Sequence, residues 1–354
     1  MIDTDLKNLT LDELTELIKE LGEKSFRAKQ IYEWMHKKLV CSPMEMTNLS
    51  EAFRKKLSEE YRYTVLEKVV LLTSEIDGTR KYLFRLHDGN VIESVWMRYH
   101  HGNSVCISSQ VGCRMGCSFC ASTLGGRIRD LSSAEMLEQV YAIARDTGER
   151  VSNVVVMGTG EPLDNYDNLL RFIHMLTDEN GLNISQRNVT VSTCGLADRL
   201  KKLADENLAI TPALSLHAPN DELRRKLMPV ANRYSIKELM EAVDYYIEKT
   251  GRRMTFEYSL IQDVNDTPAC AKELIALLKG RNCHVNLIPV NPVEERDYKR
   301  SLITNVLSFQ NLLEKAGINV TIRREMGSDI NAACGQLRRH YESGTVSSEE
   351  ESER

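Results

Sequence analysis

The chain has 354 residues, of which 42% are hydrophobic and 27% charged, and its formal net charge is −5. This length allows one large catalytic domain with a small accessory domain, and the composition is that of an ordinary globular protein. No apolar run approaches the roughly 20 residues that span a bilayer, and the acidic, polar start of the chain does not resemble a secretory signal. We therefore expect a cytoplasmic protein with no membrane association, and a monomer by default.

Charge and cysteine content narrow the possible classes further. The negative net charge gives no support to nucleic-acid binding by the surface as a whole, so any RNA contact would depend on local basic clusters. Nine cysteines in a long chain without a secretory signal indicate metal or redox chemistry rather than structural disulfides. The candidate basic clusters, each of which could equally be a solvated charged face, are Arg127 and Arg129, Arg224 to Lys226, Arg252 and Arg253, and Lys299 and Arg300.

Residues 1–62 are expected to form a helical accessory domain. Segments 11–23 and 25–38 both place apolar residues at the three- to four-residue spacing of amphipathic helices. Core packing explains this pattern, and RNA contact by the domain is a hypothesis. The residues of the second segment expected to face the core are Phe26, Ile31 and Met35.

Residues 63–100 are predicted to form a short antiparallel β segment that links the two larger parts. Two Asp-Gly pairs, at 77–78 and 88–89, separate three runs rich in β-branched and aromatic residues. Asp-Gly between such runs favours a tight hairpin.

From residue 101 to 342, short apolar runs rich in β-branched residues alternate with helical patterns. Repeated β–α units of this kind predict an α/β fold with a parallel sheet covered by helices. Six or seven units would form a partial or full TIM-like (β/α) barrel, in which functional side chains gather at the C-terminal ends of the strands. A flat, doubly wound sheet is the alternative. The acidic segment 343–354 is expected to be a disordered tail.

The most specific motif is a cysteine cluster directly after the first predicted strand of this region. Cys113, Cys117 and Cys120 have the spacing C-x3-C-x2-C, and three thiolates so close together suit a soft metal or an iron–sulfur cluster. A structural zinc site would normally take a fourth ligand from a second paired motif, and no such pair is present. A cluster with three protein ligands leaves one iron open to a substrate. Gly112 and Gly116 would allow the loop to turn tightly.

Polar residues at the ends of other predicted strands are candidates for a common ligand site. Gly160 and Glu161 follow one strand, where glycine permits close backbone approach and a carboxylate can receive an ammonium group. Each residue alone could equally have a capping or turn role. The further candidates are Ser192, Ser215, Leu216, His217 and Asn291.

The cysteine spacing, with an aromatic residue before the last cysteine, resembles the signature of the radical S-adenosylmethionine (SAM) superfamily. The resemblance implies a [4Fe–4S] cluster on the three cysteines, with SAM bound at the open iron and held by the strand-end residues. An electron from the cluster would split SAM into methionine and a 5′-deoxyadenosyl radical. With the segments around Cys106, Cys334 and residues 26–34, nearly the whole chain is similar to the RlmN family, the dual-specificity adenine C2 methyltransferases of 23S ribosomal RNA and transfer RNA.

The RlmN resemblance implies roles for three more residues. Cys334 would take a methyl group from one SAM, and the radical from a second SAM would activate the S-methylcysteine to add to adenine C2. Glu93 would accept the C2 proton, and burial on its strand would suit it to this task, whereas a solvent-facing glutamate is the alternative. Cys106 would attack the sulfur of Cys334, releasing methylated RNA and leaving a transient disulfide. The electron donor usual for this resemblance is a small flavoprotein.

Three other functions remain open from the sequence. A sister family methylates adenine C8 of the same ribosomal nucleotide and confers antibiotic resistance; residues 160–162 and Ile288–Pro289 before Asn291 favour the C2 family. An iron–sulfur RNA-binding protein without catalysis would need the cluster but not Cys334, and a zinc-binding structural protein would contain no iron. The cysteines to which the resemblance gives no role are Cys41, Cys194, Cys270 and Cys283.

Overall fold

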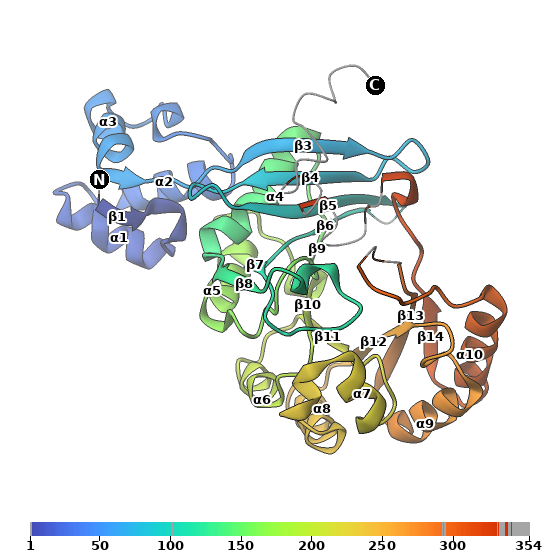
Figure 1. The fold of residues 1–354 in the computed structure, drawn as a ribbon. Helices are drawn as coiled ribbons and strands as arrows, with labels where there is room; N and C mark the ends of the chain where they lie inside the picture. The colour runs from blue at the N-terminus through green and yellow to red at the C-terminus, as the bar shows by residue number, and fades with distance from the viewer. Residues whose placement is uncertain are drawn as a thin grey trace.

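The computed structural model describes residues 2–100, 102–291, 293, 295–330, 332, 337, 338 and 341. Its main feature is a ten-stranded sheet with the order β14-β13-β12-β11-β10-β9-β6-β5-β4-β3 (Figure 1). The strands of this sheet are β3 (Glu67–Thr73), β4 (Arg80–Arg85), β5 (Val91–Tyr99), β6 (Gly102–Cys106), β9 (Asn153–Val156), β10 (Val189–Thr193), β11 (Thr211–Ser215), β12 (Met254–Leu260), β13 (Cys283–Pro289) and β14 (Asn319–Ile322).

In this sheet, β6 and the strands from β9 to β14 run parallel to one another and follow one another in chain order. A doubly wound sheet would reverse its strand order, so that alternative is wrong. Right-handed crossovers that all progress in one direction place the helices on one face, which leaves the inner face for a site (Figure 1). The helices that follow the strands are α4 (Ser133–Thr147), α5 (Tyr166–Thr177), α6 (Ala197–Asp205), α7 (Asp221–Leu227), α8 (Ile236–Thr250), α9 (Pro268–Leu278) and α10 (Ile303–Lys315).

The outermost strands, β3 and β14, do not pair with each other among the described residues, so the predicted barrel is partial rather than closed. The antiparallel segment is confirmed, and it continues the same sheet because β5 pairs directly with β6. Gly78 and Gly89 lie in its two turns with φ of 72° and 83°, which glycine adopts without strain.

The N-terminal part contains three helices and a small parallel ribbon. Ile31 and Met35 are fully buried, as predicted, but Phe26 is 52% exposed and that prediction is wrong. Five residues at the helical rotation place Phe26 about 140° around the axis from Ile31, so the two cannot share a face. The elements here are β1 (Ile2–Asp5), α1 (Leu11–Glu20), α2 (Phe26–His36), α3 (Glu51–Glu60) and β2 (Tyr61–Arg62), with short 3-10 helices at η1 (Leu6–Asn8) and η2 (Pro43–Glu45).

The helical part packs firmly against α4. Lys7 and Glu138 form a fully buried ion pair of 2.7 Å, and His36 Nδ1 lies 2.8 Å from the Tyr141 hydroxyl. Burial lowers the pKa of His36 to about 3, so the ring is neutral at this interface. Among the described residues, no helix combines the length and the apolar character that crossing a membrane requires.

The remaining short elements lie in the loops of the larger part: β7 (Gln110–Gly112), β8 (Arg127–Asp130), η3 (Ala121–Thr123), η4 (Gln186–Asn188), η5 (Pro229–Asn232) and η6 (Ser328–Ile330). The expected tail, 343–354, lies outside the described residues. The domain boundaries suggested by the sequence, after residues 62 and 100, stay predictions.

Candidate active site

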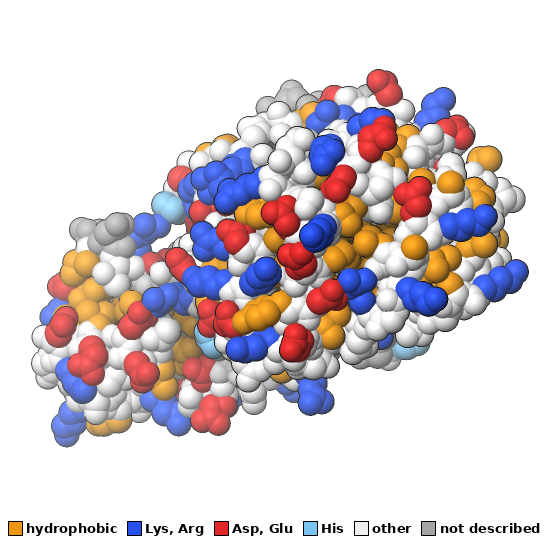
Figure 2. Space-filling view, turned by 90° about the horizontal axis from the view of Figure 1, so that it is seen from below, with side chains coloured by type: hydrophobic (Ala, Val, Ile, Leu, Met, Phe, Trp, Pro, Cys, Tyr) orange, Lys and Arg blue, Asp and Glu red, His pale blue; other side chains and the backbone are white. Residues whose placement is uncertain are grey.

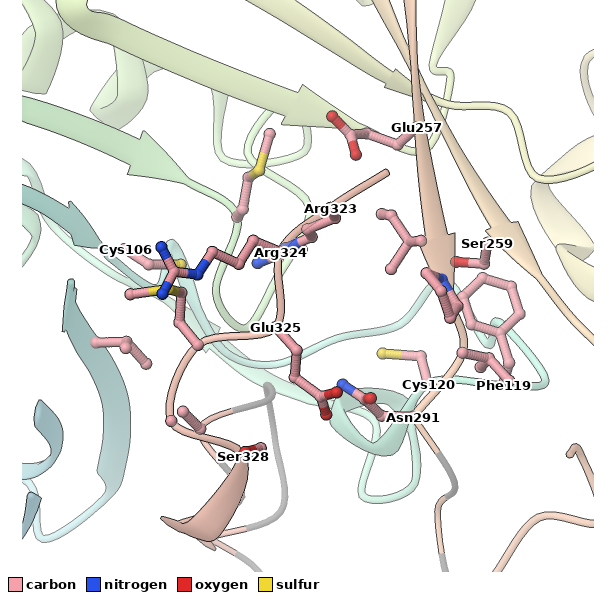
Figure 3. A pocket seen from close by; sticks show the side chains of 18 of the residues that line it. Cys106, Phe119, Cys120, Glu257, Ser259, Asn291, Arg323, Arg324, Glu325 and Ser328 are labelled. Atoms are coloured by element: carbon pink, nitrogen blue, oxygen red, sulfur yellow. The ribbon is translucent and has the colours of Figure 1, made fainter. Parts of the chain in front are cut away.

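A cavity of about 400 Å³ lies on the inner face of the sheet. Cys106 lies on one side of it, and Phe119 and Cys120 lie on the other (Figure 3). The other lining residues predicted from the sequence are Ser192, Ser215, His217 and Asn291. The structure therefore brings together side chains from the ends of four strands, β6, β10, β11 and β13, with the last cysteine of the cluster.

The cysteine cluster occupies a loop between β7 and β8, which pair as a short antiparallel ribbon. Gly112 closes the loop with φ 76°, and a Cβ there would lie 1.9 Å from the carbonyl oxygen of Gly126, so only glycine fits. Cys113 donates its N–H to the same oxygen over 2.9 Å. The loop is thus folded tightly enough to present three thiols from a stretch of eight residues.

The chemistry of these donors fits an iron–sulfur cluster. Burial raises the pKa of Cys113 to about 12 and raises that of Cys117 as well, so iron binding must displace protons from both thiols. In the described part of the chain, no three His, Cys, Asp or Glu side chains converge to hold a single metal ion. A cubane is compatible with separated thiolates because each one binds a different iron.

The cluster loop is tied to the turn that follows β9. Arg114 contacts Asp164 through Nε over 2.9 Å, and Gln110 Oε1 accepts the N–H of Glu161 over 2.9 Å. Gly160 has φ 114°, and a Cβ there would lie 2.7 Å from Ser109 Oγ and from Gln110 Cβ. The glycine is therefore required by packing against the chain that leads to the cysteines.

Three predicted ligand residues lie outside the cavity lining. Glu161 is 3% exposed, and its carboxylate accepts the N–H groups of Leu163 and Cys194 at 3.0 and 2.7 Å. Burial raises the pKa of this carboxyl group, and the two N–H groups oppose the shift. Gly160 forms the adjacent turn, and Leu216 is fully buried in the core.

His217 lines the cavity, and a hydrogen bond holds its ring in one orientation. Its backbone has φ 54°, and its Nδ1 accepts the N–H of Ser259 over 2.9 Å. Burial lowers the pKa of His217 to about 3, so the ring is neutral and the proton resides on Nε2. The Phe119 ring meets the imidazole edge-on at 4.9 Å between centroids, which joins the cluster loop to the end of β11. Beside it, the hydroxyl groups of Ser192 and Ser215 lie 3.5 Å apart.

Glu93 is 4% exposed, so the solvent-facing alternative for this residue is wrong. Its Oε2 lies 3.2 Å from the buried ammonium of Lys81, and its Oε1 accepts the N–H of Arg338 over 2.6 Å. A small void beside the main cavity is lined by both Glu93 and Cys106. Two of the three residues to which the resemblance gives catalytic roles are therefore neighbours, whereas the third, Cys334, lies outside the described residues.

Other functional candidates were missed in the sequence because they resemble ordinary strand and loop residues. Glu257, on β12, is 5% exposed, lines the cavity and accepts a hydrogen bond from Asn286 Nδ2 over 2.9 Å. Burial raises the pKa of Glu257, and the positive charge of Arg323 opposes the shift. Arg323 and Arg324 line the cavity just after β14 (Figure 3). The available signal for Glu257 was that it is the one charged residue of β12.

The basic clusters proposed for RNA contact have different surroundings. Arg224 is fully buried, so its assignment to an RNA-binding surface is wrong. Arg127 and Arg129 pair with nearby carboxylates, and Arg300 lines the cavity. Basic and acidic side chains are intermingled over the face shown in Figure 2.

No disulfide joins any two of the eight cysteines that the structure describes, so a standing disulfide is not supported. Of the cysteines without an expected role, Cys194 and Cys283 are buried, Cys270 is half-buried and Cys41 is exposed.

The open parallel sheet with a three-cysteine loop after its first strand defines a radical SAM enzyme, a class that carries a [4Fe–4S] cluster and uses SAM. Comparison with protein families agrees: residues 107–294 match the radical SAM superfamily, and residues 4–62 match the ribosomal RNA large subunit methyltransferase N-terminal domain.

Individual relatives indicate the family within the radical SAM class. The chain is 65% identical over 342 residues to a probable dual-specificity RNA methyltransferase RlmN of Lachnoclostridium phytofermentans, covering 97% of this chain and 96% of the relative. A protein of the same description from Lachnospira eligens is 65% identical over 338 residues, covering 96% and 97%. A crystal structure of a radical SAM methyltransferase from Sphaerobacter thermophilus superimposes with a TM-score of 0.91 at 43% identity, covering 94% of this chain and 98% of that one.

The chain belongs to the RlmN family of radical SAM dual-specificity RNA methyltransferases. It is therefore an enzyme, and the zinc-binding and non-catalytic alternatives are set aside.

Proposed function

We propose that this enzyme methylates adenine C2 in 23S ribosomal RNA and in transfer RNA through an S-methylcysteine at Cys334. The observation that carries the proposal is the convergence of Cys106, Cys120 and Ala332 on one cavity. Ala332 precedes Cys334 by two residues, and two residues of extended chain span about 7 Å. The chain length between these two residues therefore limits the distance between their Cα atoms to about 7 Å.

The cofactors supply the radical chemistry. With an electron from the cluster on Cys113, Cys117 and Cys120, two SAM molecules per turnover would supply the methyl group on Cys334 and then a deoxyadenosyl radical. Four side chains that line the cavity would hold SAM: Ser192, Ser215, His217 and Asn291. The adjacent turns, which would also contact SAM, are formed by Gly160, Glu161 and Leu216.

The residues beside the cavity would complete the reaction. Glu93, held in place by Lys81 and by the N–H of Arg338, would take the proton from adenine C2, and the unpaired electron left on the adduct would return to the oxidised cluster. Cys106 would then form a bond to the sulfur of Cys334 while the sulfur–carbon bond breaks. The electron pair of that bond stays on the RNA-bound carbon, which gains a proton and becomes the methyl group. A reductant would restore both thiols, because a transient disulfide is left behind.

The partners proposed here are the two RNAs and an electron donor such as a small flavoprotein, with the enzyme acting as a cytoplasmic monomer. A substrate adenine within folded RNA must be unpaired or extruded to enter a cavity of this size. On the face shown in Figure 2 the charges are intermingled, which fits RNA recognition there by local basic clusters.

The two cysteine variants test the mechanism. Cys334→Ala should abolish methylation because no sulfur remains to accept the methyl group. Cys106→Ala should accumulate a covalent enzyme–RNA adduct, which denaturing gels and mass spectrometry detect. Free turnover of Cys106→Ala without an adduct would show that Cys106 does not resolve the intermediate.

The position of methylation is tested separately, because the C8-methylating sister family shares the cluster and both cysteines. RNA carrying deuterium at adenine C2 or at C8 is incubated with reconstituted enzyme and analysed by mass spectrometry. Loss of deuterium from C2 alone supports the proposal, and loss from C8 overturns it.

A further inference from the structure

Arg224 is a buried cation that the reaction described above does not use. It belongs to α7, and its side chain is fully buried. Nη2 donates to the carbonyl oxygen of Cys194 over 2.6 Å, and Nε donates to that of Leu216 over 3.3 Å. Gly195 makes room for it, since a Cβ there would lie 3.0 Å from Nη2.

Among the described residues, this guanidinium lacks two interactions that a buried arginine normally makes. Nη1 is buried and has no hydrogen-bond partner among the described residues. No described carboxylate forms an ion pair with Arg224 either. An unsatisfied buried donor costs about 1–3 kcal/mol, and a buried charge without a counter-ion costs several more. An arginine in such surroundings indicates that an anion with acceptor atoms completes the site.

The cluster loop packs against the end of α7 and can supply such an anion. Ser118 donates its N–H to the carbonyl oxygen of Leu227 over 2.9 Å, which joins the loop directly after Cys117 to the end of α7. A Cβ on Gly116 would lie 3.4 Å from the Pro229 ring, so the loop rests on the segment that follows α7.

We infer that Arg224 is a positioning residue for the iron–sulfur cluster, donating Nη1–H to the sulfur-rich anion on the three cysteines and offsetting its negative charge. The inference rests on the proposed function, because it requires that cluster. A cluster on three thiolates gains a further negative charge when it is reduced, so a nearby buried cation stabilises the reduced state more than the oxidised state. Arg224 should therefore raise the reduction potential and make the cluster easier to reduce.

The test is an anaerobic redox titration of the full chain after iron and sulfide reconstitution, without SAM or RNA. Arg224→Met removes the charge and keeps an apolar chain of similar length. At a fixed potential it should lower the ratio of reduced to oxidised cluster about tenfold, a shift of ~59 mV for a one-electron couple. Arg224→Lys keeps the positive charge and loses the planar guanidinium group. Its ratio of reduced to oxidised cluster should therefore stay within about threefold of the wild-type ratio.

Arg225→Met is the matched control. Arg225 is the next residue of α7 and is exposed, so its removal should leave the potential unchanged. An iron-loaded Arg224→Met chain with the wild-type potential overturns the inference. So does a variant whose only defect is weaker SAM binding, because that result would assign Arg224 to the substrate instead.

A second measurement does not depend on the folding of Arg224→Met. Wild-type protein containing arginine labelled with ¹⁵N in the guanidinium group is examined by pulsed EPR in the reduced state. A ¹⁵N coupling that persists in Arg225→Met and disappears in Arg224→Lys supports the inference, and no coupling in the wild type overturns it. A wild-type chain that takes up no iron would instead refute the proposed function.

Discussion

Lys81 offers the most direct test of how the site is held together. Its ammonium is fully buried and lies 3.2 Å from Oε2 of Glu93, which is 4% exposed. At an effective dielectric constant of about 20, two unit charges at this separation attract each other by about 5 kcal/mol. Removing one member of such a pair typically costs about 3–5 kcal/mol, because the other charge stays buried without a partner.

Lys81→Met should lower the free energy of unfolding by about 4 kcal/mol at pH 7.5. The loss arises because the Glu93 carboxylate stays buried while the ammonium that faces it is gone. Adding Glu93→Gln to Lys81→Met should restore most of the stability, since the buried carboxylate is then replaced by a neutral amide.

Urea denaturation followed by circular dichroism at pH 7.5 measures these differences. Arg80→Met is the control: Arg80 lies beside Lys81 on β4, is partly exposed, and its ion pair with Asp146 spans 3.2 Å. Such a pair should contribute less than about 1 kcal/mol. The reasoning is refuted if Lys81→Met is as stable as the wild type at pH 7.5, or if adding Glu93→Gln to it restores none of the lost stability.

Two further predictions concern the cluster loop and the buried histidine. Gly112→Ala should lose most of its bound iron after reconstitution, because its Cβ would lie 1.9 Å from the Gly126 carbonyl oxygen; Gly148→Ala, with φ 66° and open space around it, should keep its iron. For His36, burial holds the pKa at about 3, below the ordinary 6.5. The unfolded chain therefore takes up a proton that the folded chain does not, and stability falls by about 1.4 kcal/mol between pH 7.5 and 5.5. His36→Asn should remove this part of the pH dependence in urea titrations, and an unchanged dependence would contradict the assignment.

The sequence alone determined the secondary structure and the cysteine loop. Apolar periodicity and turn residues are local signals, so the alternating strands and helices, the Asp-Gly hairpins and the C-x3-C-x2-C motif are readable without a fold. The strand-end residues Ser192, Ser215, His217 and Asn291 could be predicted as one site, because parallel strands carry their C-terminal ends to the same edge.

Only the tertiary structure decided which charges are buried and what they face. Lys81 meets Glu93 because β4 pairs with β5 in one register, and a shift of one residue would turn Lys81 to the other face. Arg224 has an unremarkable sequence context between Leu223 and Arg225, yet the packing of α7 under the cluster loop buries it completely. Pairing register and helix packing join residues far apart in the chain, and no local pattern carries that information.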